Sequence, residues 1–263
     1  MKKLLMAMLL AMLVTANTAF ALDANFNKNF KDIDDKEDFK EAILILKQHG
    51  IVKGQGETGE FKPKASLNRA ELLKILVESM YADGEKFDDL PNPYSTEIVK
   101  VKNELEGYKA KCFEDVKGNE WFAKYICYAK AKGWIKGYSD GKFRPAQIVN
   151  FVEALKMALE IHGIEYDEDK TEWFKGIVER AANHNLIPED ISEFAQQLRR
   201  DQMADLIARI IKHKQGKLED YLGARKQLKV DYQTLKAKKN LLKEKKEKEN
   251  EVEVEDEDED DSN

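Results

Sequence analysis

One helix–loop–helix pattern occurs three times in the chain, and this repeat constrains the fold more than any other feature. Its first half reads DFKEAILILKQHG, WFAKYICYAKAKG and WFKGIVERAANHN in the three copies. Each segment has apolar or small residues at helical spacing, which predicts an amphipathic helix. Gly50, Gly133 and Asn185 end the three segments, and glycine or asparagine at that place is typical of a left-handed helix end.

The second half of each copy predicts another helix with an apolar stripe. These segments read LNRAELLKILVESM, VNFVEALKMALEIH and LRRDQMADLIARII. Asn68 and Asn150 are predicted N-caps, and Glu71 and Glu153 stand three residues later, as in a capping box. A single helix–loop–helix unit has too little apolar area to be stable alone. We therefore expect the three units to pack side by side around a shared core.

The loop between the two helices is most regular in the second copy, GWIKGYSDGKFRP at residues 133–145. Its three glycines predict tight turns that reverse the chain direction. Three aromatic residues, Trp134, Tyr138 and Phe143, have two possible roles. They can fill the space over the helix ends, or they can line a groove for a ligand.

The motifs FEDV, WFAKYICYAKAKGWIKGYSDGKFRP and LNRAE together resemble the S-layer homology (SLH) family. The resemblance implies a mainly α fold of three modules in a pseudo-threefold bundle: module 1 at 28–81, module 2 at 112–163 and a degenerate module 3 at 164–213. It also implies an exported protein that binds a cell-wall glycan non-covalently, either a secondary cell-wall polymer or peptidoglycan, in grooves between modules.

The same resemblance suggests which residues bind the glycan. The family's Thr-Arg-Ala-Glu motif falls on residues 68–71, and its arginine can pair with an anionic sugar substituent. The second copy has Phe151 at the arginine position, and the third has Arg200. A structural role as a surface ion pair or a helix cap is the alternative for these polar residues. The implied glycan-binding residues are Asn68, Arg69, Glu71, Trp134, Tyr138 and Arg200.

The N-terminal residues 1–21 predict a secretory signal peptide. Lys2 and Lys3 precede an apolar run, and Ala19-Phe20-Ala21 is a small-x-small cleavage pattern. An uncleaved membrane anchor is the alternative, although the run is short for a span. After cleavage we expect no transmembrane segment, and a location in the cell wall, at the cell surface or in the periplasm of a bacterium. The formal net charge of −6 argues against nucleic acid as a partner.

The two cysteines, Cys112 and Cys127, are predicted to form a disulfide, because an exported chain can keep one. Two buried thiols are the alternative. No histidine lies near enough in the sequence to complete a tetrahedral metal shell with them. We therefore expect no metal and no cofactor.

Three further segments lie outside the repeats. Residues 82–111 form an insertion with a predicted helix, and residues 251–263 predict a disordered acidic tail. Residues 214–250 predict a long charged helix or a short coiled coil. This helix could mediate self-association or bind a protein partner, or it could be a solvated single helix. The predicted seam consists of Leu218, Leu222, Leu228, Tyr232, Leu235 and Leu242.

The sequence contains no arrangement typical of an enzyme. The histidines are scattered, and neither a nucleophile elbow nor a phosphate-binding loop occurs. Two non-catalytic functions remain. The chain is either an envelope protein that binds a cell-wall glycan, or a structural scaffold that binds a protein through the module trimer and the C-terminal helix.

Overall fold

The computed structural model describes residues 30–54, 59–82, 112–241 and 243. The predicted signal peptide, the acidic tail and nearly all of the insertion lie outside these ranges. Within them the chain is mainly α-helical, as predicted, and its extended pairing is limited to isolated bridges. None of the described helices combines the length and the hydrophobicity needed to cross a bilayer.

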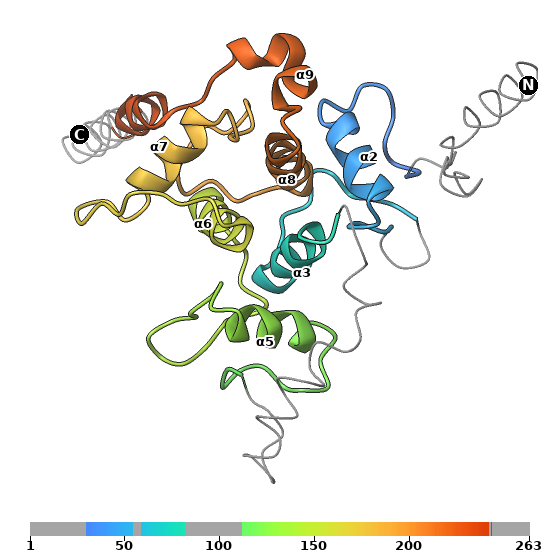
Figure 1. Cartoon of the computed structure of the whole chain (residues 1–263), viewed down its shortest axis with the longest axis vertical. Coiled ribbons are helices and arrows are strands. Elements are labelled where there is room, and N and C mark those ends of the chain that lie inside the picture. The colour runs from blue at the N-terminus through green and yellow to red at the C-terminus, as the bar shows by residue number, and fades with distance from the viewer. Residues whose placement is uncertain (1–29, 55–58, 83–111, 242, 244–263) are drawn as a thin grey trace, which may run out of the picture.

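Each repeat contributes one outer and one central helix (Figure 1). The outer helices are α2 (Lys40–Gln48), α5 (Ala123–Ala131) and α7 (Lys175–Asn183). The central helices are α3 (Arg69–Ser79), α6 (Phe151–His162) and α8 (Arg200–Lys214). The predicted helix–loop–helix unit is therefore present in all three copies, including the degenerate third one.

The outer helices end as the sequence predicts. Gly50, Gly133 and Asn185 have φ values of 71°, 74° and 54°, so all three are left-handed. The N–H of the next residue then donates to a carbonyl of the preceding helix at 2.9 Å in every copy. Asparagine replaces glycine in the third copy because it tolerates this conformation better than most residues.

The central helices α3 and α6 begin with the predicted capping boxes. The Asn68 side chain accepts a hydrogen bond from the Glu71 N–H at 2.9 Å, and the Glu71 carboxylate accepts one from the Asn68 N–H at 3.0 Å. Asn150 and Glu153 repeat this exchange at α6. These reciprocal bonds satisfy two N–H groups that a helix start otherwise leaves unpaired.

A closed ring of backbone hydrogen bonds joins the three central helices just before they begin. The Leu67 N–H donates to the Leu198 carbonyl at 3.3 Å, Leu198 donates to Val149 at 3.1 Å, and Val149 donates to Leu67 at 3.0 Å. Each repeat therefore gives one bond and receives one. This ring supports the predicted pseudo-threefold arrangement, which stays a prediction.

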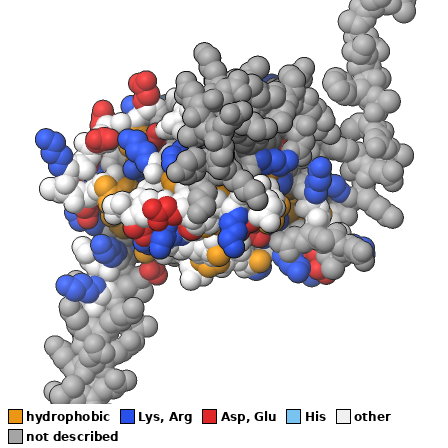
Figure 2. All heavy atoms as spheres, turned by 90° about the horizontal axis from the view of Figure 1, so that it is seen from below, with side chains coloured by type: hydrophobic (Ala, Val, Ile, Leu, Met, Phe, Trp, Pro, Cys, Tyr) orange, Lys and Arg blue, Asp and Glu red, His pale blue; other side chains and the backbone are white. Residues whose placement is uncertain are grey.

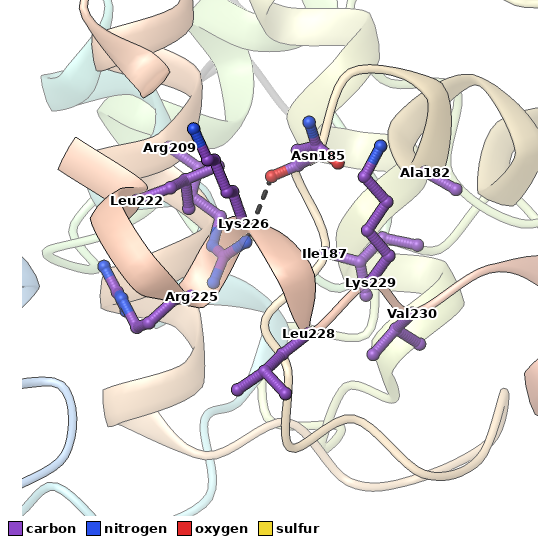
Figure 3. Close-up of a pocket in the computed structure, with 10 residues that line it drawn as sticks. All are labelled: Ala182, Asn185, Ile187, Arg209, Leu222, Arg225, Lys226, Leu228, Lys229 and Val230. Atoms are coloured by element: carbon purple, nitrogen blue, oxygen red, sulfur yellow. Dashed lines mark hydrogen bonds between the residues drawn. The ribbon is translucent and has the colours of Figure 1, made fainter. Parts of the chain in front are cut away.

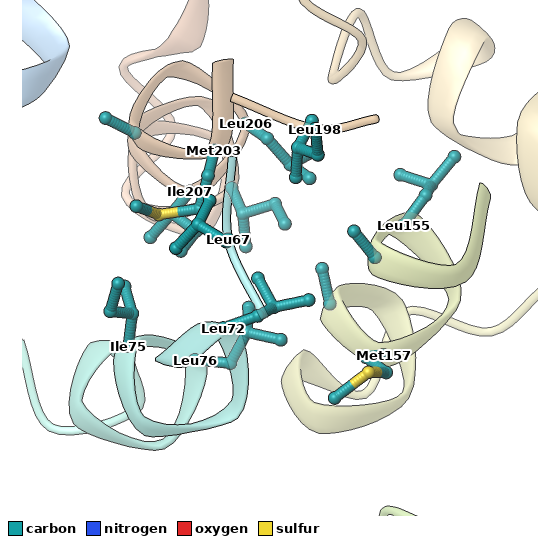
Figure 4. Packing of buried hydrophobic residues seen from close by; sticks show 14 of the residues in the cluster. Leu67, Leu72, Ile75, Leu76, Leu155, Met157, Leu198, Met203, Leu206 and Ile207 are labelled. Atoms are coloured by element: carbon teal, nitrogen blue, oxygen red, sulfur yellow. The ribbon is translucent and has the colours of Figure 1, made fainter. Parts of the chain in front are cut away.

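The outer helices pack across repeat boundaries. Helix α5 lies against α3, α7 lies against α6, and α2 lies against α8. Each outer helix therefore contacts the central helix of the preceding repeat, and α2 closes the circle. One apolar cluster runs through all three repeats. Figure 4 shows part of it, between α3, α6 and α8, with side chains such as Leu72, Leu155 and Leu206.

The two cysteines form the predicted disulfide. Cys112 and Cys127 are bonded, with their Cα atoms 5.2 Å apart, and the alternative of two buried thiols is excluded. Cys127 belongs to α5. The bond therefore ties the first residue of the second repeat to the outer helix of the same repeat.

The prediction of a long single helix over residues 214–250 is wrong. Helix α8 ends at Lys214, a short α9 follows at Leu218–Leu222, and a 3-10 helix, η2, occupies Gly223–Gln227. Residues 232–241 are helical again. Gly223, with a φ of 50°, lies where α9 gives way to η2. Glycine at this place interrupts a helix because it readily adopts positive φ.

Most residues of the predicted coiled-coil seam pack against other parts of the same chain. Leu218, Leu222, Tyr232 and Leu235 are all buried against the body of the protein, whereas Leu228 is exposed. Leu242 lies outside the described residues. Side chains that are already packed in this way cannot form a seam with a second copy, so these residues do not support self-association.

Candidate binding groove

A cavity of about 300 Å³ opens where the three repeats meet beside the glycine-rich loop. Arg69 lines it from the start of α3, residues 133–138 line it from the second-repeat loop, and Trp173 lines it from the third repeat. The remaining lining residues lie on α6 or just after it: Glu153, Lys156, Met157, Glu160 and Glu168. Three predicted residues from two separate segments, Arg69 from α3 and Trp134 and Tyr138 from the loop, are thus brought together.

Arg69 is held rigidly although it carries a charge. Only 8% of its surface is exposed. Its Nε donates to the Phe143 carbonyl at 2.9 Å, and its guanidinium carbon lies 4.8 Å from the Phe143 ring centroid and 4.9 Å from that of Tyr138. Such stacking is favourable because the face of an aromatic ring is electronegative.

Burial lowers the pKa of the Arg69 guanidinium, while Tyr138 and Glu153 raise it. Because arginine does not deprotonate in proteins, Arg69 stays cationic at neutral pH. Among the described residues, no carboxylate forms a salt bridge with it. A buried, charged and rigid guanidinium at a cavity wall is suited to an anionic ligand.

Asp115, the third residue of FEDV, fixes the carbonyl that holds Arg69. Its carboxylate accepts from the N–H of Phe143 at 2.8 Å and from the N–H of Arg144 at 2.7 Å. Arg144 has a φ of 60°, a conformation that is rare outside glycine and that these bonds hold in place. Sequence reasoning did not assign this role to Asp115, although FEDV at residues 113–116 and its counterpart FKDI at residues 30–33 share an aspartate at the same position.

Trp134 and Tyr138 pack inside the protein, which is one of the two roles that the sequence left open, whereas contact with a ligand stays a prediction. Both line the cavity, and both are partly buried in the protein. The Trp134 ring contacts Tyr128 edge to face at 5.6 Å, and the Tyr138 hydroxyl accepts from Gln147 Nε2 at 3.1 Å. These contacts fix the orientation of the two rings, so each presents a preformed surface to the groove.

Gly137 has no possible substitute in this loop. Its φ is 71°, and an added Cβ would lie 2.4 Å from the Phe113 ring and 2.8 Å from the Lys142 carbonyl. Both distances are far shorter than any van der Waals contact. Glycine at this position therefore lets the loop approach Phe113 closely while Tyr138, the next residue, faces the groove.

The groove carries mixed charge. Arg69, Lys136 and Lys156 are cationic, and three glutamates oppose them. Lys156 Nζ lies 5.5 Å from the ring centroid of Trp173, whose surface is 48% exposed. The coloured part of the surface in Figure 2 also mixes acidic and basic side chains. The fixed guanidinium of Arg69 is therefore a more distinct feature of the groove than any broad electrostatic field. Sequence reasoning missed Lys156 and Trp173, because only the fold brings them to the loop.

Asn68 and Glu71, which the resemblance placed among the binding residues, do not line this cavity. They form the capping box of α3 described above. The structure thus gives them the structural role that the sequence left open as an alternative.

Arg200 occupies the same kind of environment as Arg69, in the third repeat. Its Nε donates to the Phe61 carbonyl at 2.7 Å, and its guanidinium carbon lies 4.8 Å from the Phe61 ring centroid. Burial lowers its pKa, and Glu71 opposes that shift. The first-repeat loop beside it differs, because Ile51 stands where the second repeat has Trp134. Arg200 therefore lacks the tryptophan neighbour that Arg69 has.

Phe151 is the structural counterpart of the two arginines. Its N–H donates to the Gln196 carbonyl at 2.8 Å, as the Arg69 N–H donates to the Gln147 carbonyl at 2.9 Å. Its side chain is fully buried. Phe151 thus occupies the arginine position in the structure as well as in the sequence of the repeat. A ligand would find no guanidinium at this position.

No histidine is among the described residues that line the groove, and its acidic lining residues are Glu153, Glu160 and Glu168. In the parts of the chain that the structure describes, no three His, Cys, Asp or Glu side chains are grouped so as to hold a metal ion. His162 Nε2 lies 2.9 Å from Ser79 Oγ inside the protein. The rings of His184 and His213 lie 4.7 Å apart at the ends of α7 and α8.

Comparison with known proteins agrees with the motifs. Residues 29–73 and 113–155 match the family model of the S-layer homology domain. The middle cell wall protein of Brevibacillus brevis is 25% identical over 175 residues, which are 66% of this chain and 14% of that protein. The cellulosome-anchoring protein of Acetivibrio thermocellus is 27% identical over 133 residues, 51% of this chain and 26% of that protein.

The surface-layer 125 kDa protein of Lysinibacillus sphaericus is 31% identical over 157 residues, which are 56% of this chain and 11% of that protein. This chain therefore spans only a minor part of each of these relatives. The family match does not extend over residues 164–213, so the third module stays a prediction that the shared helix–loop–helix geometry supports. The similarity to the S-layer homology domain therefore rests on residues 29–73 and 113–155.

Proposed function

We propose that this chain is a non-catalytic protein of the bacterial cell envelope that binds a cell-wall glycan through the Arg69 groove. The observation that carries the proposal is the rigid, buried guanidinium of Arg69, which stacks on Tyr138 at the wall of a cavity of about 300 Å³. The two matches to the S-layer homology domain support it, as do the relatives named for the cell wall, for the surface layer and for anchoring.

The chemistry of the groove suits a sugar with an anionic substituent. The Arg69 fork would pair with the anion, and the rings of Trp134, Tyr138 and Trp173 would contact the apolar faces of the sugar. Charge-assisted hydrogen bonds of this kind contribute about 1.5–3 kcal/mol, or about 10- to 100-fold in affinity. The ligand is a secondary cell-wall polymer or peptidoglycan. The location that follows is outside the cytoplasm, at the cell wall or cell surface.

Sedimentation with purified cell-wall sacculi tests this proposal. Arg69→Ala should weaken binding at least 10-fold. Arg200→Ala is a matched control, because it removes the same type of carbonyl bond and ring contact but not the groove with Trp134. We expect a similar loss of stability in both variants and a larger loss of binding for Arg69→Ala. If neither substitution weakens binding to the sacculi, the arginine mechanism is excluded. A scaffold that binds a protein would then be the favoured function.

A further inference from the structure

The third repeat contains a counterpart of the Arg69 groove, and that counterpart is filled. Asn185, Ile187 and Arg209 line a small cavity there, and they correspond in the repeat to Gly133, Ile135 and Glu160 of the Arg69 groove. The space that remains is about 10 Å³, against about 300 Å³ in the second repeat. A volume of that size holds about one water molecule.

Side chains of α9, η2 and the residues just after them fill this space (Figure 3). Leu222 and Val230 are buried, and Arg225 is partly buried. In Figure 3, Asn185 and Ile187 of the third-repeat loop lie opposite the α9–η2 segment. The dashed line marks the bond from Arg209 to the Asn185 carbonyl, 3.1 Å long. The chain thus covers the third-repeat groove with its own residues 218–230, called here the C-terminal clasp.

The central helix of the third repeat differs from the other two in a way that fits the clasp. At its sixth and tenth positions α3 has Lys74 and Glu78, and α6 has Lys156 and Glu160. Helix α8 has Asp205 and Arg209 at these positions, so both charges are reversed. Lys156 and Glu160 are exposed, whereas Asp205 and Arg209 are buried.

The reversed charges bind the clasp directly. Asp205 accepts hydrogen bonds from the Tyr221 hydroxyl at 2.5 Å, from Arg225 at 3.1 Å and from Arg209 at 2.6 Å. Burial and the Asp205 charge raise the pKa of Tyr221, so its hydroxyl stays protonated and donates. A lysine at position 205, as in the other repeats, could accept none of these bonds.

The loop of the third repeat completes the contact. Glu189 lies in the segment that replaces the glycine-rich loop, and it pairs with both Arg209 and Arg225. Five polar side chains, three from the repeat and two from the clasp, therefore form one network. Breaking a buried network by removing one partner is costly, because it leaves the other charges unpaired.

We propose that the C-terminal clasp is a built-in occupant of the third-repeat groove, and that this groove is closed to the wall ligand. The differences that make the third repeat look degenerate are then adaptations to a segment of the same chain. The first half of the proposal stands on the contacts above. The second half rests on the proposed function, because it concerns where the glycan binds.

Hydrogen exchange on the chain lacking residues 1–21 tests the first half. Arg225→Gln should speed exchange at the amides of Tyr221 and Leu228 at least 10-fold. Lys226→Gln is the matched control, since Lys226 is exposed and its ion pair with Glu219 is long, at 3.9 Å. If the two variants exchange alike, the clasp is not held by this network and the proposal is wrong. Tyr221→Phe, which removes only one hydroxyl, provides the same comparison should Arg225→Gln fold poorly.

Solubilised wall fragments added to the unmodified chain test the second half. We expect slower exchange at residues 133–138 and unchanged exchange at residues 219–230. Faster exchange in the clasp would mean that the ligand displaces it, which contradicts a closed groove. If the fragments change the exchange rate in neither region, the proposed function is wrong. The comparison of Arg225→Gln with Lys226→Gln still decides whether the clasp occupies the third-repeat groove.

Discussion

Asp115→Ala should destabilise the protein and weaken its binding through one defined chain of contacts. The Asp115 carboxylate accepts two backbone hydrogen bonds, at 2.8 and 2.7 Å, from the residues whose conformation presents the Phe143 carbonyl to Arg69. Phe143 is fully buried, so its N–H would lose a charge-assisted bond with no ready replacement. The Arg144 N–H is exposed, and water can replace part of its bond.

The expected loss follows from these two bonds. We assign about 2 kcal/mol to the buried bond and about 1 kcal/mol to the exposed one, so the free energy of unfolding should fall by about 3 kcal/mol. For a body of this size that corresponds to a decrease in Tm of about 6–12 °C. Urea unfolding followed by circular dichroism measures the first quantity, and a thermal scan measures the second.

Asp140→Ala is the matched control for this experiment. Asp140 belongs to the same loop, and its carboxylate forms a salt bridge with the Arg144 guanidinium at 3.1 Å. Both side chains of this pair are exposed to solvent. Exposed pairs contribute about 0–1 kcal/mol, so the control should lose little. Asp115→Asn keeps one acceptor and should fall between the two. If Asp115→Ala is no less stable than Asp140→Ala, the FEDV motif does not hold the loop, and the explanation of how Arg69 is positioned fails with it.

Two further predictions concern stability. Reduction of the Cys112–Cys127 bond, which closes a loop of 15 residues, should lower the free energy of unfolding by about 3 kcal/mol in the chain-entropy model. Urea titrations with and without reductant measure this, and a Cys112→Ser/Cys127→Ser variant should not respond to reductant. Burial and the charge of Lys214 lower the pKa of His162 to about 3. In the unfolded chain this histidine is therefore protonated below about pH 6.5, whereas in the folded chain it stays neutral down to about pH 3. Because only the unfolded chain binds the proton between these two values, acidification across this window lowers the free energy of unfolding by about 1.4 kcal/mol per pH unit. Between pH 6 and pH 5, the free energy of unfolding should fall by about 1 kcal/mol less in His162→Gln than in the unmodified chain. An equal fall in both proteins would contradict the lowered pKa of His162.

Local features of the fold could be predicted because they depend on short-range chemistry. A left-handed helix end needs glycine or asparagine, so Gly50, Gly133 and Asn185 marked three equivalent positions. A capping box needs a polar pair three residues apart, which Asn68 with Glu71 and Asn150 with Glu153 supply. Two cysteines in an exported chain suggest a disulfide. In the first two cases the cause and the effect lie within a few residues of one another, whereas the two cysteines are 15 residues apart.

Features that depend on tertiary partners could not be predicted in the same way. The predicted seam residues after α8 recur at steps of three, four, six or seven residues, and that spacing fits a coiled coil with another chain as well as packing inside one chain. What decides between them is the polar network of Asp205 and Glu189, whose members lie up to 36 residues apart in the sequence. Likewise, the carbonyl that holds Arg69 belongs to Phe143, 74 residues further along the chain.

The crossed packing of the repeats explains why the fold needs a third repeat, although that repeat lies outside the two stretches that match the family model. Because each outer helix packs on the central helix of the preceding repeat, α6 needs α7 to cover it, and α2 needs α8. Two repeats alone would leave both of these faces open and would break the ring that joins Leu67, Val149 and Leu198. The Arg69 groove itself includes Trp173, which belongs to the third repeat. The third repeat can therefore exchange its own groove for the C-terminal clasp at no cost to the second, provided that its helices and Trp173 remain in place. Selection on ligand binding at the second repeat would then preserve the core of the third repeat while leaving its loop free to change.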